Sequence, residues 1–188
     1  MTRIVAGRAG GRTLRVPARG TRPTSERVRE ALFNALDVAG ELDGARVLDL
    51  YAGSGALGLE ALSRGAADVL FVEADRRAVE VLRANVTALG LGGTVRHGKV
   101  EAVVAEAAAA PFDLVVADPP YALEDARLTA VLGDLVARGW LTQTALVIVE
   151  RALRDGEPSW PEGLAPVRTK RYGDTALYWA EYSVTSRA

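Results

Sequence analysis

The stretch from Arg46 to Gly58, RVLDLYAGSGALG, constrains the fold of this chain more than any other part of it. It begins with a short apolar run that is typical of a parallel strand covered on both faces. Gly53, Gly55 and Gly58 follow at GxGxxG spacing, which predicts a sharp turn into a helix that begins near Ala56. Such a turn presents bare main chain and the unpaired N–H groups of the helix to a ligand. We therefore expect a nucleotide-like ligand at this turn.

Two acidic residues sharpen this interpretation, because GxGxxG alone also fits a dinucleotide site or a purely structural turn. Asp49 lies inside the end of the first strand, where its carboxylate can hold the glycine loop or attract a cationic group of a ligand. A second strand, VLFVEAD, places Glu73 at its carboxyl end, where a carboxylate can accept both hydrogen bonds of a ribose diol. The pattern therefore predicts a binding site for an adenosine-type cofactor.

A second motif stands at the end of the segment FDLVVADPPY. The apolar part of this segment is typical of a buried strand, and the motif that follows it is Asp118, Pro119, Pro120 and Tyr121. Consecutive prolines donate no hydrogen bonds and have fixed φ angles, so the carbonyl groups there are rigidly aimed and able to accept. Asp118 adds a carboxylate acceptor, and Tyr121 adds a flat ring and a hydroxyl. Together these groups suit an exocyclic amino group on a planar ring, with acceptors on its N–H bonds and the tyrosine stacked on the base.

This arrangement predicts group transfer to an aromatic amine, which is a poor nucleophile because its lone pair is delocalised into the ring. Acceptors on its protons make the nitrogen more electron-rich and stabilise the charge that develops during attack. An activated methyl group on a cofactor in the glycine loop completes an in-line transfer, for which alignment supplies much of the rate. No strong general base is required, since the methylated amine loses its proton readily. The alternative for DPPY is a stiff exit from the strand with no chemical role.

Composition excludes several other kinds of site. The chain has no cysteine, which excludes disulfides and thiolate metal sites. His97 is the only histidine, so a His-based metal cluster or a Ser-His-Asp triad within one chain is excluded or very strained. The sequence shows neither an apolar run of about 18 residues nor a basic-then-apolar leader. We therefore expect no metal, no membrane partner, a monomer and a cytoplasmic location.

Charge is distributed unevenly along the 188 residues, although the net charge is only −1. Residues 1 to 30 carry eight arginines and two glutamates, so the remainder is acidic. Two short β-prone runs around Ala9 suggest a hairpin, and residues 17 to 23 have the composition of a loop. We therefore predict a basic N-terminal β-hairpin arm, residues 1–22, and a catalytic domain, residues 23–188. The arginines expected to bind a polyanion such as RNA are Arg3, Arg8, Arg12, Arg15, Arg19, Arg22 and Arg27.

The basic arm is expected to be mobile until RNA orders it, because it contains glycines and lacks a large apolar face. It would contact the RNA phosphates, which the otherwise acidic body repels. The alternative is a hairpin that packs on the core and is charged on its outer side.

From Gly44 onward, strands and helices alternate, which predicts a mostly parallel sheet with helices on both faces. The preceding segment, TSERVREALFNAL, predicts a helix with Thr24 as its cap and Glu26 in its first turn. After Pro161 the sequence predicts two strands joined around Gly173, a hairpin that closes one edge of the sheet. The other strands are expected at residues 46–50, 68–73, 94–97, 112–117 and 145–150, and further helices at 56–64, 76–89, 99–109 and 123–138.

Taken together, DLYAGSGALGLEALSRGA, Glu73 and DPPY resemble class I S-adenosylmethionine-dependent methyltransferases that act on amino nitrogens. RIVAGRAGGRTLRVP followed by RPTSERVREALFNAL narrows the resemblance to the RsmD family, and the resemblance covers nearly the whole chain. It implies a Rossmann-like α/β fold with a mostly parallel, seven-stranded sheet. It also implies transfer of a methyl group from S-adenosylmethionine to N2 of the guanine at position 966 of 16S ribosomal RNA, as free rRNA or in the small ribosomal subunit.

The family pattern also implies roles for individual residues. The methionine and ribose side of the cofactor would be lined by Asp49, Tyr51, Gly53, Ser54, Gly55 and Gly58. Glu73 would bind the ribose hydroxyls. Lys99 and Val100 would lie near the adenine, although methyltransferases often carry a small acid where Lys99 stands. The cofactor would be covered from outside by the segment with Arg22, Pro23, Thr24 and Arg27, and the catalytic loop would be Asp118, Pro119, Pro120 and Tyr121.

Three other functions fit part of the sequence. The glycine loop also fits a nicotinamide oxidoreductase, which has no use for DPPY. The basic arm fits a non-enzymatic RNA-binding protein, whose RNA function would survive the loss of Asp118. DPPY also fits adenine-N6 methyltransferases that act on DNA, because acceptors around an amino group do not determine which base carries it.

Overall fold

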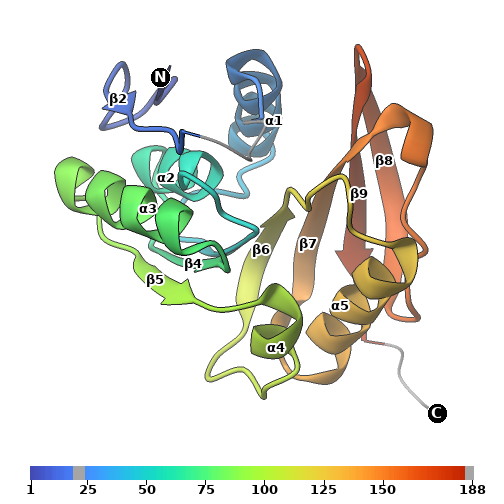
Figure 1. The fold of residues 1–188 in the computed structure, drawn as a ribbon. Coiled ribbons are helices and arrows are strands. Elements are labelled where there is room, and N and C mark those ends of the chain that lie inside the picture. Colours follow the sequence, from blue (N-terminus) through green and yellow to red (C-terminus); the bar gives the residue numbers. More distant parts are fainter. Residues whose placement is uncertain (19–23, 185–188) are drawn as a thin grey trace.

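The structure is a computed structural model that describes residues 1–18 and 24–184. Its centre is a seven-stranded sheet of five parallel strands, extended at one edge by an antiparallel hairpin (Figure 1). In spatial order the strands are β5 (Thr94–His97), β4 (Asp68–Glu73), β3 (Arg46–Leu50), β6 (Phe112–Ala117), β7 (Leu141–Ala152), β9 (Thr175–Tyr182) and β8 (Leu164–Tyr172). This arrangement confirms the predicted Rossmann-like α/β fold with its C-terminal hairpin.

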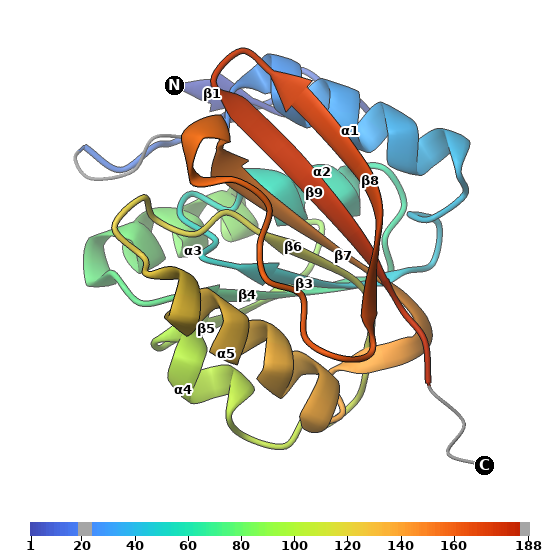
Figure 2. The ribbon, with the colours of Figure 1, turned by 90° about the vertical axis from the view of Figure 1, so that its right-hand side faces the viewer.

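Helices cover both faces of the sheet (Figures 1 and 2). One face is covered by α1 (Glu26–Val38), α2 (Ala56–Ser63) and α3 (Arg76–Leu89), and the other by α4 (Val100–Val104) and α5 (Asp125–Ala137). Within the described parts of the chain, no helix is long and apolar enough to cross a membrane.

The central strands are apolar on both faces because both faces are covered. In β3, Val47 packs into the core beneath α1, α2 and α3, whereas Leu48 and Leu50 pack into the core beneath α4 and α5. Asp49 is the exception, since its carboxylate faces α2 and accepts a hydrogen bond from the Gly58 N–H. The near-continuous apolar runs in the sequence therefore reflect two separate cores.

The carboxyl ends of β3, β4 and β6 lie side by side at one edge of the sheet. Leu50 at the end of β3 is in register with Val72 on one side and with Ala117 on the other. The direction of chain progression reverses between β3 and β6, and ligands of open α/β sheets bind in the crevice at such a reversal. Because the glycine turn follows β3 and the DPPY segment follows β6, the fold places the two motifs next to each other.

The helix α4 is shorter than the predicted helix at 99–109, although alanine is a strong helix former. The indole N–H of Trp140 lies 3.0 Å from the carbonyl oxygens of both Val104 and Glu106. The Ala108 N–H donates to a carbonyl outside the helix. These tertiary hydrogen bonds replace the next helical turn and end α4 at Val104.

Two further differences concern β7 and the cap of α1. β7 extends beyond the predicted 145–150 because its last residues continue to pair with β9, up to Ala152 opposite Thr175. The helix α1 is capped by Ser25, whose Oγ accepts from the Val28 N–H over 3.2 Å, and not by Thr24. The hydroxyl of Thr24 is instead hydrogen-bonded at the candidate site. The predicted bounds of β3, β4, β5, β6 and α3 are confirmed.

The N-terminal segment forms the predicted hairpin from β1 (Thr2–Arg3) and β2 (Thr13–Leu14), and the hairpin packs on the body, which was the alternative to a mobile arm. Ile4 and Leu14 have no exposed surface and belong to the core beneath α1, α2 and α3. A Cβ on Gly7 would lie 2.0 Å from the Ser63 carbonyl oxygen, so the segment touches α2 directly. The boundary predicted at residue 22 lies outside the described residues and stays a prediction.

Buried charges also attach the N-terminal segment to α2. The Glu60 carboxylate accepts from the N–H groups of Val5 and Ala6 at 2.8 and 3.2 Å. Glu60 is fully buried and also pairs with the buried Arg29 of α1 and with Arg64. The apolar residues of the segment are few and widely spaced, so its attachment depends on an acid more than 50 residues away that no local pattern indicates.

Candidate active site

The glycine turn after β3 adopts a backbone conformation that few residues accept. Tyr51, Gly53 and Gly55 have φ angles of 59°, 56° and 86°. For a tyrosine this left-handed region costs of order 1 kcal/mol, and such strain clusters at ligand sites. The Gly53 N–H donates to Glu73 Oε1 over 2.8 Å, which ties the turn to the end of β4. Glu73 Oε2 accepts from the Asp75 N–H over 2.8 Å, so both carboxylate oxygens are held in place.

Gly55 and Gly58 are required by packing within the protein. A Cβ on Gly55 would lie 2.3 Å from a methyl carbon of Leu82, and a Cβ on Gly58 would lie 2.4 Å from the ring of Phe71. Both distances are far shorter than a van der Waals contact, so a side chain at Gly55 would collide with α3 and a side chain at Gly58 would collide with β4. The predicted cofactor contact of the two glycines, and that of the buried Ser54 between Gly53 and Gly55, remains a prediction.

Asp49 is almost completely buried, with 1% of its surface exposed. Its Oδ2 accepts from the Gly58 N–H over 3.0 Å, and its Oδ1 has no hydrogen-bond partner among the described residues. Burial raises the pKa of this carboxyl well above its ordinary value. The Gly58 hydrogen bond lowers the pKa, while the charges of Asp118 and Glu73 raise it further. A neighbouring cation would stabilise the carboxylate, so the site fits the positively charged cofactor that the resemblance implies.

The ring of Tyr51 packs against the core beneath α4 and α5. Its hydroxyl is buried and has no hydrogen-bond partner among the described residues. Burial raises the pKa of this phenol; the charge of Glu101 raises it further, and that of Arg127 lowers it. Tyr51 therefore anchors the strained turn on the α5 side, and its contact with a cofactor remains a prediction.

Lys99 and Val100 lie beside Glu73, as the parallel pairing of β4 and β5 requires. His97 at the end of β5 is in register with Glu73, and the Gly98 N–H donates to the Glu73 carbonyl over 2.9 Å. Lys99 is exposed and directly precedes α4, whereas Val100 is buried. The structure therefore brings both residues to the predicted edge of the cofactor site, and which of them meets the adenine remains a prediction.

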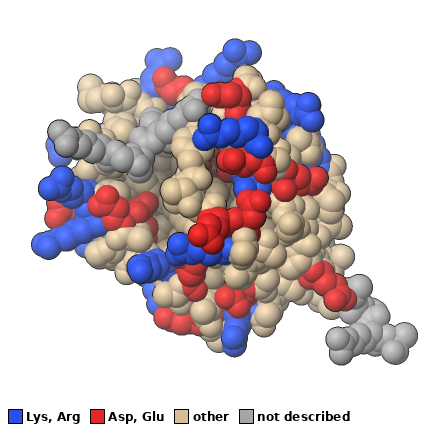
Figure 3. Space-filling view, turned by 45° about the vertical axis from the view of Figure 1, so that its right-hand side comes forward, with Lys and Arg blue, Asp and Glu red and all other residues tan. Residues whose placement is uncertain are grey.

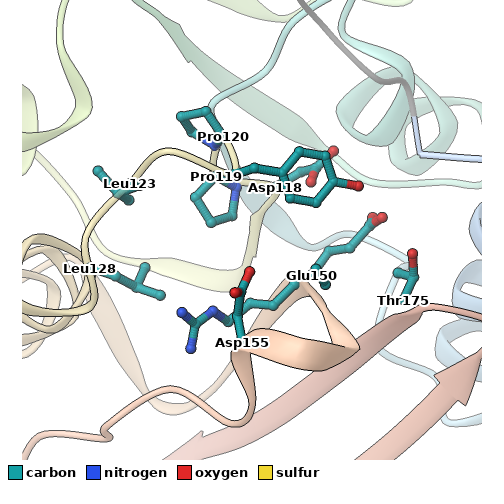
Figure 4. Close-up of a pocket in the computed structure, with 11 residues that line it drawn as sticks. Asp118, Pro119, Pro120, Leu123, Leu128, Glu150, Asp155 and Thr175 are labelled. Atoms are coloured by element: carbon teal, nitrogen blue, oxygen red, sulfur yellow. The ribbon is translucent and has the colours of Figure 1, made fainter.

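The DPPY segment lines a small hollow of about 20 Å³ that is open to solvent (Figure 4). The Asp118 N–H donates to the Leu50 carbonyl over 3.4 Å, so this loop starts directly beside the glycine turn. Tyr121 is 51% exposed at the rim, with the Arg154 guanidinium 6.0 Å from its ring centre. Across the hollow from Pro119 and Pro120 lies the Glu150 side chain (Figure 4).

Thr24 connects two carboxylates at this hollow. Its Oγ1 lies 3.0 Å from Asp118 Oδ2 and 2.6 Å from Glu150 Oε2, and Thr24 itself is buried. Sequence reasoning missed Glu150, which it interpreted only as the end of a strand. A signal was present, because Glu150 follows an apolar strand as Glu73 does. The role of Thr24 toward the cofactor remains a prediction.

A second hollow, of about 350 Å³, shares Glu150 and Thr175 with the first. Arg27 of α1 and Arg171 of the β8–β9 hairpin line it. The sequence predicted only a structural role for this hairpin, so Arg171 is a further candidate residue that could not be anticipated.

Among the arginines expected to bind RNA, those that the structure describes are exposed: Arg3, Arg8, Arg12, Arg15 and Arg27. Arg3 pairs with Glu26 over 3.0 Å, whereas Arg8 and Arg12 donate to backbone carbonyls. The other two, Arg19 and Arg22, lie outside the described residues. Basic and acidic side chains interleave on the face shown in Figure 3. Over residues 1–18 and 24–184, no group of three acids or histidines is placed to hold a metal ion.

The sheet order, the glycine turn after β3 and the DPPY loop after β6 define a class I methyltransferase. A solved structure from Escherichia coli, described as a candidate methyltransferase, superposes with a TM-score of 0.86 at 36% identity, covering 96% of this chain and 97% of the other. A Thermus thermophilus protein described as hypothetical superposes with a TM-score of 0.80 at 35% identity, covering 98% and 100%.

Sequence comparison defines the family. The family model described as "Conserved hypothetical protein 95" matches residues 2–181. The ribosomal RNA small subunit methyltransferase D of Escherichia coli K12 is 39% identical over 183 residues, which cover 95% of this chain and 90% of the relative. The chain belongs to this family, the RsmD family of methyltransferases.

Proposed function

We propose that this protein transfers a methyl group from S-adenosylmethionine to the exocyclic N2 of a guanine in 16S ribosomal RNA, at position 966. The observation that carries the proposal is the contact between the two motif loops, where the Asp118 N–H donates to the Leu50 carbonyl at the start of the glycine turn. A cofactor in the turn and an amine at the DPPY loop would then lie within reach of each other. The name of the Escherichia coli relative, a ribosomal RNA small subunit methyltransferase, supports an rRNA substrate.

The residues around the glycine turn would hold the cofactor. Asp49, whose buried carboxylate lacks a cationic neighbour among the described residues, would face the positive charge of S-adenosylmethionine. Glu73, already fixed by the Gly53 and Asp75 N–H groups, would accept the ribose hydroxyls. S-adenosylmethionine supplies an activated methyl group when bound. The turn contributes position and charge, and no residue near it is required as a base.

The residues of the DPPY loop would act on the amine. Asp118 and the rigid carbonyls before and within the Pro119–Pro120 pair would accept its N–H groups, which stabilises the positive charge that develops on nitrogen during attack. The ring of Tyr121 would stack on the base and hold it in line with the methyl group. The methylated amine then releases a proton to solvent.

The RNA would approach over the rim of both hollows. The exposed arginines of the N-terminal hairpin would contact phosphates on one side, with Arg27 and Arg171 at the second hollow contacting phosphates that flank the target base. We propose that the protein acts as a cytoplasmic monomer on rRNA, either free or within the small ribosomal subunit.

Complementation tests this function. The gene would be expressed in an Escherichia coli strain that lacks its own ribosomal RNA small subunit methyltransferase D, and the nucleosides of a 16S fragment containing position 966 would be analysed by mass spectrometry. Wild-type protein should restore N2-methylguanosine, and a folded Asp118→Ala variant should not. An unmodified guanine with wild-type protein, or methylation of an adenine, would contradict the proposal. Assays with purified 16S rRNA and purified subunits then identify the substrate form.

A further inference from the structure

Glu150 is the structural neighbour of Asp118. Strands β6 and β7 are parallel, and Ala117 is in register with Val149. The next residue of each strand is therefore an acid at the same edge of the sheet. Both side chains reach Thr24 Oγ1, with Asp118 Oδ2 at 3.0 Å and Glu150 Oε2 at 2.6 Å. Two carboxylates, one that follows β6 and one within the neighbouring β7, thus line one hollow.

The hollow is rich in hydrogen-bond acceptors. The Thr24 hydroxyl has a single proton and can donate to only one of the two carboxylates at a time. Each carboxylate has about four lone-pair positions, and the two prolines contribute carbonyls without N–H donors. Arg151 also lines the hollow, but its guanidinium donates to the Gly156 carbonyl and to the Asp125 carboxylate. A ligand with several adjacent donors suits this surface.

The Watson–Crick edge of guanine has such donors, because the N1–H stands next to the exocyclic N2 amino group. Adenine has an amino group next to an unprotonated N1, which presents a lone pair. A carboxylate opposite N1 attracts the N1–H of guanine and repels the lone pair of adenine. A site built to accept a particular N–H rejects an analogue that lacks it more strongly than apolar contacts can.

We propose that Glu150 is a specificity-determining residue that accepts the N1–H of the target guanine while Asp118 accepts from its N2 amino group. This inference rests on the proposed function. It also separates guanine from adenine, which the DPPY motif alone does not do. The binding surface for the base is then a carboxylate pair, with the Thr24 hydroxyl between its two members.

The test compares target bases that differ at N1. 2-Aminopurine has the same 2-amino group as guanine, but its N1 is unprotonated. Two otherwise identical small-subunit RNAs, one with guanine and one with 2-aminopurine at the target position, would be methylated by full-length protein. The measured quantity is the ratio of kcat/KM for the two RNAs. Because the two amines differ intrinsically in reactivity, the comparison is between the ratio for wild type and the ratio for Glu150→Gln.

Wild type should prefer guanine, and Glu150→Gln should reduce that preference by about 10- to 100-fold, the scale for one hydrogen bond to a charged group. The glutamine amide can donate to the N1 of 2-aminopurine, so activity on that base should rise in absolute terms. S-adenosylmethionine affinity should be unchanged. Glu162→Gln, at an exposed acid outside both hollows, should leave the ratio as in wild type.

An unchanged ratio in a folded Glu150→Gln variant would overturn the inference, even if both rates fell together, because equal loss indicates a structural role. Failure of wild type to methylate the guanine RNA at all would instead remove the proposed function. The two outcomes are distinguished by the wild-type rate alone.

Discussion

The charged form of the buried Asp49 carboxyl lowers the stability of the free protein, although in the proposed function it would face the positive charge of the cofactor. It is buried with a single hydrogen bond from the protein, and the nearby charges of Asp118 and Glu73 further raise its pKa. Because its folded-state pKa is raised, the folded protein binds more protons than the unfolded chain between the two pKa values. The free energy of unfolding therefore falls as pH rises from the unfolded-state pKa toward the folded-state pKa.

Asp49→Asn should remove this pH dependence, since the amide oxygen can still accept from the Gly58 N–H. Without cofactor, the variant should gain stability relative to wild type as pH rises above the ordinary aspartate pKa of about 4, and it should bind S-adenosylmethionine more weakly. Denaturant unfolding across this range and calorimetric titration measure both effects. A difference in stability between the two proteins that does not change with pH would contradict the assigned pKa direction.

Glu73 accepts a hydrogen bond from the Gly53 N–H, and in the proposed function it would also accept the ribose hydroxyls. Glu73→Ala should weaken S-adenosylmethionine binding by about 1.5 to 3 kcal/mol, the scale for losing hydrogen bonds to a charged group. Glu73→Gln, which keeps one acceptor for Gly53, should lose less. Calorimetry on folded variants measures this order, and unchanged affinity in Glu73→Ala would be incompatible with it.

For single residues, the sequence predicts the position of a side chain when neighbouring residues in the sequence determine that position. Glu73 ends one apolar strand and Asp118 follows another, each within a recognisable motif, so their placement at the same edge of the sheet could be anticipated. The contacts of Thr24 with Asp118 and Glu150 could not, because they join residues 94 and 126 positions apart. The cap of α1 was misassigned for the same reason: Thr24 and Ser25 are both good caps, and only tertiary contacts decide between them.

Helix α3 connects the glycine turn to the N-terminal segment through one side chain. Asn85 Nδ2 donates to the carbonyls of Ser54 and Arg15 at 2.9 and 3.0 Å, and its Oδ1 accepts from the Arg15 N–H at 2.9 Å. Asn85 is buried, so these backbone groups have no easy replacement in solvent. The hairpin that carries the basic residues and the turn that would carry the cofactor are thereby held in one arrangement.

Asn85→Asp should lower the free energy of unfolding by roughly 2 to 4 kcal/mol, because two donated hydrogen bonds are lost and a carboxylate faces two carbonyl oxygens. It should also weaken cofactor binding by displacing Ser54. Asn34→Asp is a matched control, since the exposed Asn34 accepts from Arg64 and a carboxylate can do the same. Equal stability of the two variants in urea would show that the Asn85 contacts contribute little.

Strand and helix bounds could be predicted where one periodic pattern decides them, as for β3 to β6 and α3. The predicted bounds were wrong where a contact with a residue far away in the sequence determines the end of the element. Trp140 ends α4 early, and pairing with β9 prolongs β7. The N-terminal hairpin was expected to be mobile because it contains glycines and lacks a large apolar face, yet its Ile4 and Leu14 are buried in the core.

Charge distribution across the whole molecule bears on RNA binding. The hairpin is packed, but its arginines still point outward, and Arg27 lines the second hollow. Replacing Arg12, Arg15 and Arg27 together with alanine should flatten the slope of log affinity against log salt by roughly 2 to 3 units if each contacts a phosphate. S-adenosylmethionine affinity is the control and should not change. Parallel lines for variant and wild type would mean that these arginines make no phosphate contacts.

The central claim is that Asp118 accepts from the amine in the transition state. Its most direct test is the single-turnover rate of methyl transfer to small-subunit RNA, measured for Asp118→Ala with saturating S-adenosylmethionine and RNA. The rate should fall by roughly a hundredfold or more, as for loss of a transition-state acceptor, while the dissociation constants of cofactor and RNA stay close to those of wild type. A folded Asp118→Ala variant that transfers the methyl group at the wild-type rate would contradict the account.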